Sequence, residues 1–69
     1  MEMTTTFNGK TVKIPRGYNG PDENGFYMNG HGIEYALVQY GWKDDAVICL
    51  EPVYSKHRRI VELEEVESD

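Results

Sequence analysis

Two apolar runs separated by a short polar turn form the strongest pattern in the chain. The first run spans residues 32–42, and the second, residues 46–50, follows Lys43, Asp44 and Asp45. Both runs are rich in β-branched and aromatic residues and end at turn-forming residues. The pattern therefore predicts a β-hairpin at the centre of the chain.

The first run of this hairpin carries apolar side chains on both of its faces, because alternate residues of a strand point in opposite directions. The two sets are Ile33, Tyr35 and Leu37 on one face, and Ala36, Val38, Tyr40 and Trp42 on the other. A small domain with a single core needs only one such face. The other face is expected to cover part of a closed barrel or to bind a partner. A symmetric homodimer that buries Ala36, Val38 and Tyr40 would shield it.

A shorter strand is predicted at residues 10–14, where Val12 and Ile14 alternate with polar residues and point inward. Asn8-Gly9 is a typical hairpin turn and predicts a further short strand at residues 4–7. These elements place a small hairpin at the start of the chain.

Towards the C-terminus the chain turns at residues 51–56, and residues 57–63 are predicted to form the last strand. The two apolar residues of 63–66 are three positions apart, a spacing that suits a single 3-10 turn. The alternative is a glutamate-rich helix from Ile60 onward. Residues 67–69 are expected to fray.

Residues 16–32 form a long glycine-rich segment between the first hairpin and the central one. Five glycines, Pro21 and three asparagines divide it into turns, with a short strand expected at residues 26–28. Long loops in compact domains are often functional. Because this one carries Tyr18, Phe26 and Tyr27, its apolar side chains should pack against another surface.

This order of elements resembles the SH3-like small barrels, namely the Tudor- and KOW-type modules and the electron-transport accessory proteins. The matching parts are residues 9–14, 34–40 and 60–66. The resemblance implies an all-β fold, a small SH3-like barrel of about five short strands. A long glycine-rich loop would follow the first strand, and a 3-10 turn would lie near the C-terminus. Gly17 fills the place of the glycine that follows the first strand in KOW modules, although the insertion after it departs from that pattern.

Size and composition narrow the function classes. Sixty-nine residues make a single domain, 1–69. The net charge of −5 disfavours broad contact with nucleic acid and suits a basic partner.

Cys49 is the sole cysteine, so it is expected to be a small buried hydrophobe in a reducing compartment. With His31 and His57 it makes no recognisable zinc spacing, and neither a metal nor a cofactor is expected. Residues 1–6 lack the pattern of a secretory leader and no run has the length of a membrane span, so the predicted location is the cytoplasm.

The aromatic residues of the chain predict recognition of a protein partner. The candidate partner-binding residues are Tyr18, Phe26, Tyr27, His31, Tyr40, Trp42 and Tyr54. Tyr35 is the surest core residue, whereas Tyr18, Tyr27 and Trp42 are expected on the surface. The predicted function is a non-enzymatic protein–protein interaction module, or a small accessory or phage-type inhibitor protein, docking on a larger protein.

A small-molecule or nucleotide binder is the alternative function, in which tyrosines stack on a base at an oligomer interface. Lys56, Arg58 and Arg59 are then the candidate anion-binding residues, since arginine offers a planar fork to phosphate. A cysteine–histidine catalytic pair of Cys49 and His31 is the weakest hypothesis, because a thiol in an apolar strand is inert.

Overall fold

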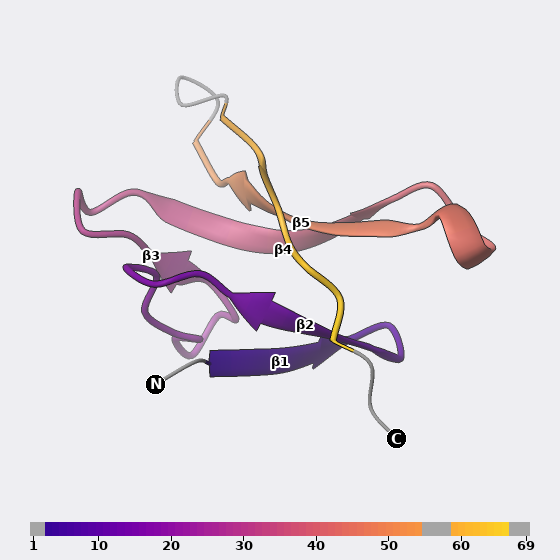
Figure 1. Ribbon diagram of the computed structural model, residues 1–69. Coiled ribbons are helices and arrows are strands. Elements are labelled where there is room, and N and C mark those ends of the chain that lie inside the picture. The colour runs from indigo at the N-terminus through magenta and orange to yellow at the C-terminus, as the bar shows by residue number, and fades with distance from the viewer. Residues whose placement is uncertain (1–2, 55–58, 67–69) are drawn as a thin grey trace.

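The computed structural model describes residues 3–54 and 59–66, and the fold of this part of the chain is all-β (Figure 1). The elements in chain order are β1 (Met3–Phe7), β2 (Lys10–Ile14), β3 (Tyr27–Met28), β4 (Glu34–Tyr40), the 3-10 turn η1 (Lys43–Asp45), β5 (Val47–Pro52) and β6 (Val61–Glu62). β1 pairs with β2, and a second antiparallel sheet has the order β3-β4-β5-β6. Within the described ranges, no helix is long and apolar enough to cross a membrane.

Both predicted hairpins are confirmed. Asn8 and Gly9 have φ values of 51° and 79°, the two positive angles that a type I′ turn requires, and they join β1 to β2 in register. β4 and β5 form the central hairpin, which pairs from Tyr40 opposite Val47 to Tyr35 opposite Pro52. β5 thus continues two residues beyond the predicted end of the second run.

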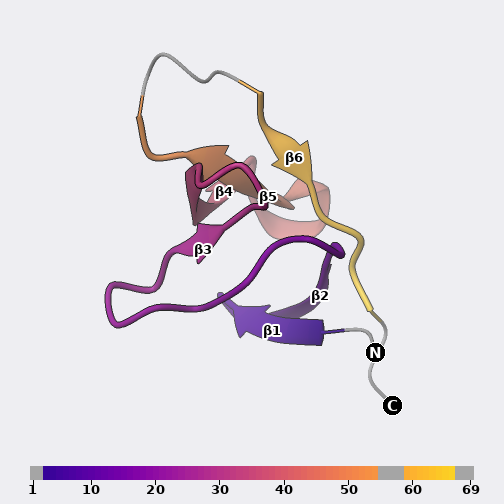
Figure 2. The same ribbon diagram turned by 90° about the vertical axis from the view of Figure 1, so that its left-hand side faces the viewer.

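A single extended segment, residues 61–66, joins the two sheets into a curled half-barrel. At one end of the segment, Leu63 N–H donates to the Ile48 carbonyl of β5 at 2.9 Å. At the other end, Lys13 N–H of β2 donates to the Glu64 carbonyl at 2.9 Å. Figure 2 shows this segment running from β5 and β6 down to β2 along one side of the molecule. An ion pair of 3.7 Å between Lys10 and Glu65 lies near the same seam.

These backbone bonds overturn the prediction of a 3-10 turn at residues 63–66, and equally the alternative helix from Ile60. Backbone groups that hydrogen-bond to two strands must stay extended, and Leu63 is buried between them. The 3-10 turn lies instead at η1, inside the central hairpin. The predicted last strand, residues 57–63, is shorter in the described residues, where it comprises β6 alone. Residues 57–58 and the tail that was predicted to fray, 67–69, lie outside the described residues.

The core fills the concave side of the curled sheet. Its buried members are Val12, Ile14, Tyr27, Tyr35, Ile48, Leu50 and Leu63, with Phe7, Tyr18, Ile33, Leu37 and Val61 packed at its border. The predicted inward direction of Val12, Ile14 and Tyr35 is confirmed. Among the described residues, no polar or charged residue is buried, so burial of apolar surface is the main source of stability.

The long loop is ordered by two asparagine- or aspartate-centred turns on either side of β3. The Asp22 carboxylate accepts bonds from the N–H groups of Asn24 and Phe26, each at 2.9 Å. The Asn29 side-chain oxygen likewise accepts from His31 and Ile33 N–H at 2.9 Å. Such turns replace the ladder bonds that a loop lacks, so the predicted division of this segment into turns is confirmed.

Candidate docking surface

The structure corrects the assignment of Tyr27 to a partner-binding surface. Tyr27 is 2% exposed, whereas its neighbour Met28 is 44% exposed. In the ladder Tyr27 lies opposite Tyr35, and paired residues share one face of a sheet, so both rings enter the core. A register shift of one residue would have exchanged Tyr27 with Met28. Pairing with β4, a tertiary contact, therefore decided which side chain is buried.

Tyr18 and Phe26, two further predicted contact residues, are half-buried, and Tyr18 packs against the core. The ring of Tyr18 meets Tyr35 edge-on, with ring centroids 5.2 Å apart and an interplanar angle of 80°. Burial, and next the neighbouring Tyr35, raise the pKa of the Tyr18 hydroxyl. Tyr18 therefore serves mainly to close the core, and only the outer part of each side chain is available to a partner.

The remaining aromatic candidates do not form one continuous surface. Tyr40 and Trp42 lie at the C-terminal end of β4, whereas His31 lies before its N-terminal end. Tyr54 follows β5, whose last residues pair with the start of β4, so it lies at the same end as His31. Seven strand residues separate the two ends, roughly 23 Å at the usual rise per residue. The predicted surface is thus divided, and the hairpin tip is the more exposed part.

Trp42 is the most exposed large apolar side chain among the described residues, at 82%. It precedes η1 with an extended backbone (φ −149°, ψ 163°), and Gly41 before it has φ +80°. Within the turn, Asp45 N–H donates to the Trp42 carbonyl at 3.3 Å. Asp44 and Asp45, two and three residues after Trp42, are exposed as well. The hairpin tip, defined here as residues 41–46, therefore carries an exposed indole and two exposed carboxylates.

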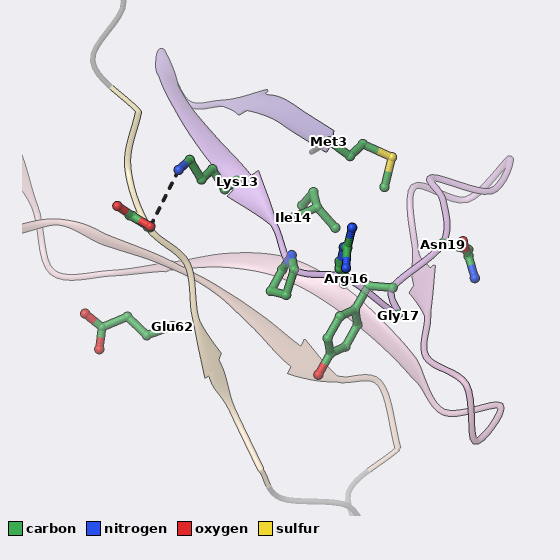
Figure 3. Close-up of a pocket in the computed structure, with 10 residues that line it drawn as sticks. Met3, Lys13, Ile14, Arg16, Gly17, Asn19 and Glu62 are labelled. Carbon is green, nitrogen blue, oxygen red and sulfur yellow. Dashed lines mark ion pairs between the residues drawn. The ribbon is translucent and has the colours of Figure 1, made fainter. Parts of the chain in front are cut away.

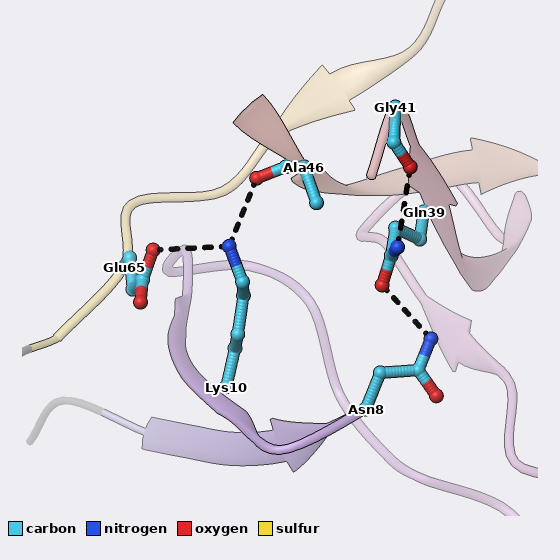
Figure 4. Close-up of polar contacts among 6 residues, drawn as sticks. All are labelled: Asn8, Lys10, Gln39, Gly41, Ala46 and Glu65. Atoms are coloured by element: carbon cyan, nitrogen blue, oxygen red, sulfur yellow. Dashed lines mark hydrogen bonds and ion pairs between the residues drawn. The ribbon is translucent and has the colours of Figure 1, made fainter. Parts of the chain in front are cut away.

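Side chains from the β1–β2 hairpin hold the tip in place (Figure 4). The Asn8 amide donates to the Gln39 side-chain oxygen at 3.0 Å, and the Gln39 amide donates to the Gly41 carbonyl at 3.2 Å. The Lys10 ammonium donates to the Ala46 carbonyl at 3.2 Å. The two ends of the tip are thus attached to the body of the domain.

Sequence reasoning missed Asn8, Gln39 and Lys10 as supports of the tip. Asn8 was predicted to be a turn residue, and that role is confirmed. Its bond to Gln39 joins residues 31 positions apart, and no local pattern in the chain announces such a contact.

Tyr40 covers the lone cysteine on the outer face of the hairpin. Its hydroxyl donates to the Glu51 carboxylate, and the pair Val38–Cys49 lies between these two residues in the ladder. The ring therefore passes over the Val38–Cys49 pair, and Cys49 is 5% exposed. The hydrogen bond to Glu51 raises the pKa of Tyr40, and burial, followed by the carboxylates of Glu62 and Glu51, raises the pKa of the Cys49 thiol. The prediction that Cys49 is a buried hydrophobe is confirmed.

We expect Cys49 to resist alkylation in the native protein and to become reactive when Tyr40 is replaced by alanine. Loss of the ring uncovers the sulfur, so the rate with iodoacetamide at pH 8 should rise at least about tenfold, since the reactive thiolate needs access as well as deprotonation. Tyr40→Phe keeps the ring and loses only the hydroxyl bond, so its rate should stay close to that of the parent. Urea denaturation of each variant separates this local uncovering from global unfolding. Equal rates for the alanine and phenylalanine variants would contradict the covering role.

A groove of about 640 Å³ lies between the end of β2 and the closing segment. It is lined by Met3, Lys13, Ile14, Pro15, Arg16, Gly17, Tyr18, Asn19, Glu62 and Glu64. In Figure 3 Ile14 lies towards the middle of this group, and the dashed line marks the ion pair between Lys13 and Glu64, 3.9 Å long. An exposed pair of this length adds little stability. The groove has an apolar floor and a rim with charges of both signs.

The structure describes only part of the predicted anion site. Arg59 is exposed, and its positive charge acts on the Tyr18 hydroxyl, where it opposes the rise in pKa. Lys56 and Arg58 lie outside the described residues, as does His57. In residues 3–54 and 59–66, no three His, Cys, Asp or Glu side chains come together as a metal site.

Comparison with protein-family models, with curated proteins and with solved structures finds no match to this chain. The class that the fold and the surface define is therefore a small all-β domain with an exposed aromatic tip. Its function has to be argued from these features of the molecule.

Proposed function

We propose that the protein is a non-enzymatic docking module that binds another protein through the hairpin tip, with Trp42 as the anchor. The 82% exposure of Trp42 carries the proposal. An indole offers roughly 200 Å² of mainly apolar surface, and covering it with a partner pocket gains several kcal/mol. Tryptophan is also among the residues that most often dominate interface energies. A small accessory or inhibitor protein acting on a larger target fits this mode of binding.

The supported backbone of the tip favours binding in one geometry. The bonds from Asn8 through Gln39 to Gly41, and from Lys10 to Ala46, restrict the tip before a partner arrives. A contact surface that is already ordered loses less conformational entropy on association. The tip is therefore better suited to docking than an unsupported turn would be.

The carboxylates of the tip define the chemistry of the partner. Asp44 and Asp45 are exposed in the same tip as Trp42, and the chain as a whole carries a net charge of −5. An apolar pocket bordered by lysine or arginine would complement both the indole and these charges. Charge complementarity of this kind mainly accelerates association and excludes wrong partners.

The test compares Trp42→Ala with Tyr54→Ala, an exposed aromatic at the opposite end of the hairpin. Each variant is immobilised and exposed to a lysate of the organism that encodes the protein, and bound proteins are identified by mass spectrometry. We expect a partner that binds the parent and Tyr54→Ala, and whose affinity for Trp42→Ala falls at least about 30-fold, the effect of a hot-spot residue. Circular dichroism should show that all three proteins are folded. A partner retained by Trp42→Ala would contradict the proposal.

We further propose that the half-barrel is a variant of the SH3-like barrels. The support is the order of elements, with an initial hairpin, a long glycine-rich segment, a central hairpin and a last extended segment that returns to β2. The placement of the 3-10 turn within the central hairpin departs from the expected arrangement.

The alternative of a small-molecule or nucleotide binder has its support in the groove. Tyr18 lines it, and the charges of Arg16 and the nearby Arg59 could face a phosphate. Glu62 and Glu64 on the same rim oppose an anion, so we favour protein docking. The alternative would be favoured if a nucleotide raised the melting temperature of the parent protein and raised that of Trp42→Ala by the same amount.

A further inference from the structure

β1 has an unpaired edge among the described residues. It pairs with β2 only, and Figures 1 and 2 show it at the border of the molecule. In a two-residue hairpin the residues that flank the turn exchange both hydrogen bonds, and bonded pairs then alternate along the ladder. Phe7 opposite Lys10 and Thr5 opposite Val12 are therefore the bonded pairs. The backbone N–H and C=O groups of Thr4 and Thr6 consequently point away from β2.

The opposite edge of the same hairpin confirms this alternation of hydrogen-bonded and non-hydrogen-bonded pairs. Thr11 and Lys13 lie opposite Thr6 and Thr4 in the ladder. Their backbone groups point away from β1, because the Thr11 carbonyl accepts from Val66 N–H at 2.8 Å and Lys13 N–H donates to the Glu64 carbonyl at 2.9 Å. One edge of the β1–β2 hairpin is thus covered by the closing segment, and the other edge pairs with no described residue.

This edge lacks the features that usually prevent strand pairing. β1 has the sequence Met-Thr-Thr-Thr-Phe, with no charge, no proline and no bulge in its pairing to β2. Natural edge strands are commonly protected by at least one of these features. Threonine and phenylalanine also favour extended backbone. The edge of β1 is therefore suited to accept another strand.

We propose that a second copy of this chain pairs with β1 in an antiparallel, two-fold symmetric manner. Thr4 of each copy would lie opposite Thr6 of the other, and Thr5 would lie opposite Thr5. In this register the outward N–H and C=O groups of Thr4 and Thr6 meet an identical set, which yields four backbone hydrogen bonds. A two-fold interface requires such self-complementarity, and threonine opposite threonine is a favourable cross-strand pair.

This interface differs from the dimer expected from the sequence, which would bury Ala36, Val38 and Tyr40. On that face the Tyr40 ring already lies over the strand and bonds to Glu51. The β1 edge, by contrast, has backbone groups without a described partner. It is also separate from the hairpin tip, so dimerisation and docking through Trp42 can be tested independently.

The first test is a proline substitution at Thr6, whose N–H faces the free edge. Thr6→Pro should retain the bonds to β2 and remove one donor from the dimer interface, whereas Thr6→Val keeps the donor and the β-branched shape. Sedimentation velocity from low micromolar to submillimolar concentration should show dimers for the parent and Thr6→Val and monomers for Thr6→Pro. The proposal would be overturned if the unsubstituted protein stayed monomeric over this whole concentration range. It would be overturned equally if the β1 edge bound an extended peptide of another protein while the protein stayed monomeric.

A cysteine pair tests the register without relying on proline. Thr5→Cys places two thiols in a directly opposed, non-hydrogen-bonded pair, within reach of a disulfide. Thr4→Cys places its thiol diagonally from its counterpart, about 7–8 Å away at the closest and beyond easy bridging. Under mild oxidation we expect a covalent dimer as the main product for Thr5→Cys and little for Thr4→Cys, with Cys49 unreactive in both. Equal cross-linking of the two variants would refute this register.

Discussion

Replacement of Tyr27 by alanine is expected to unfold most of the protein at room temperature. Tyr27 is one of the largest fully buried side chains, and truncation of a buried aromatic residue costs about 3–5 kcal/mol. A single core of this size is expected to contribute only about 3–5 kcal/mol of net stability. The substitution therefore removes nearly all of the free energy of unfolding. Urea denaturation followed by circular dichroism measures the free energy of unfolding of the parent protein and of the variant.

Tyr54→Ala is the matched control for this substitution. Tyr54 is 58% exposed, and surface replacements usually change stability by less than about 0.5 kcal/mol. If Tyr27→Ala and Tyr54→Ala had the same free energy of unfolding, the side chain of Tyr27 would have to lie on the surface, as the sequence alone suggested.

Gly20→Ala is expected to destabilise the protein by about 1–3 kcal/mol, the usual effect of overpacking. A Cβ atom at this position would lie 2.7 Å from the Phe26 carbonyl oxygen and 2.9 Å from the Tyr27 ring. The carbonyl belongs to the backbone and accepts a bond from Asp22 N–H at 2.9 Å, so it cannot move away freely. Either the loop or the buried ring must shift.

The control for this change is Gly30→Ala, in the same loop. A Cβ atom at Gly30 would meet nothing within 4 Å, and its backbone angle is not positive. Alanine there should be neutral or slightly stabilising, because it restricts the unfolded chain. Thermal unfolding of both variants checks the contrast; equal melting temperatures would mean that the loop does not pack on Tyr27 as described.

The limits of the sequence prediction are clearest in the half-buried aromatic residues. Alternation within a run fixes which residues share a face, but not which face turns inward. For Val12 and Ile14 the opposite face is polar, so the direction was evident. In β3 both Tyr27 and Met28 are apolar, and pairing with β4 made the choice. Trp42 was correctly expected on the surface, since it follows the last paired residue of β4.

By itself the sequence determined the local elements: the turn at Asn8-Gly9, the central hairpin and the division of the long loop into turns. These depend on the conformational preferences of neighbouring residues, which act in any context. The tertiary structure alone decided that residues 63–66 stay extended and that Asn8 reaches Gln39. Each of these depends on hydrogen bonds between residues far apart in the chain, and such bonds exist only once the sheet has curled around its core.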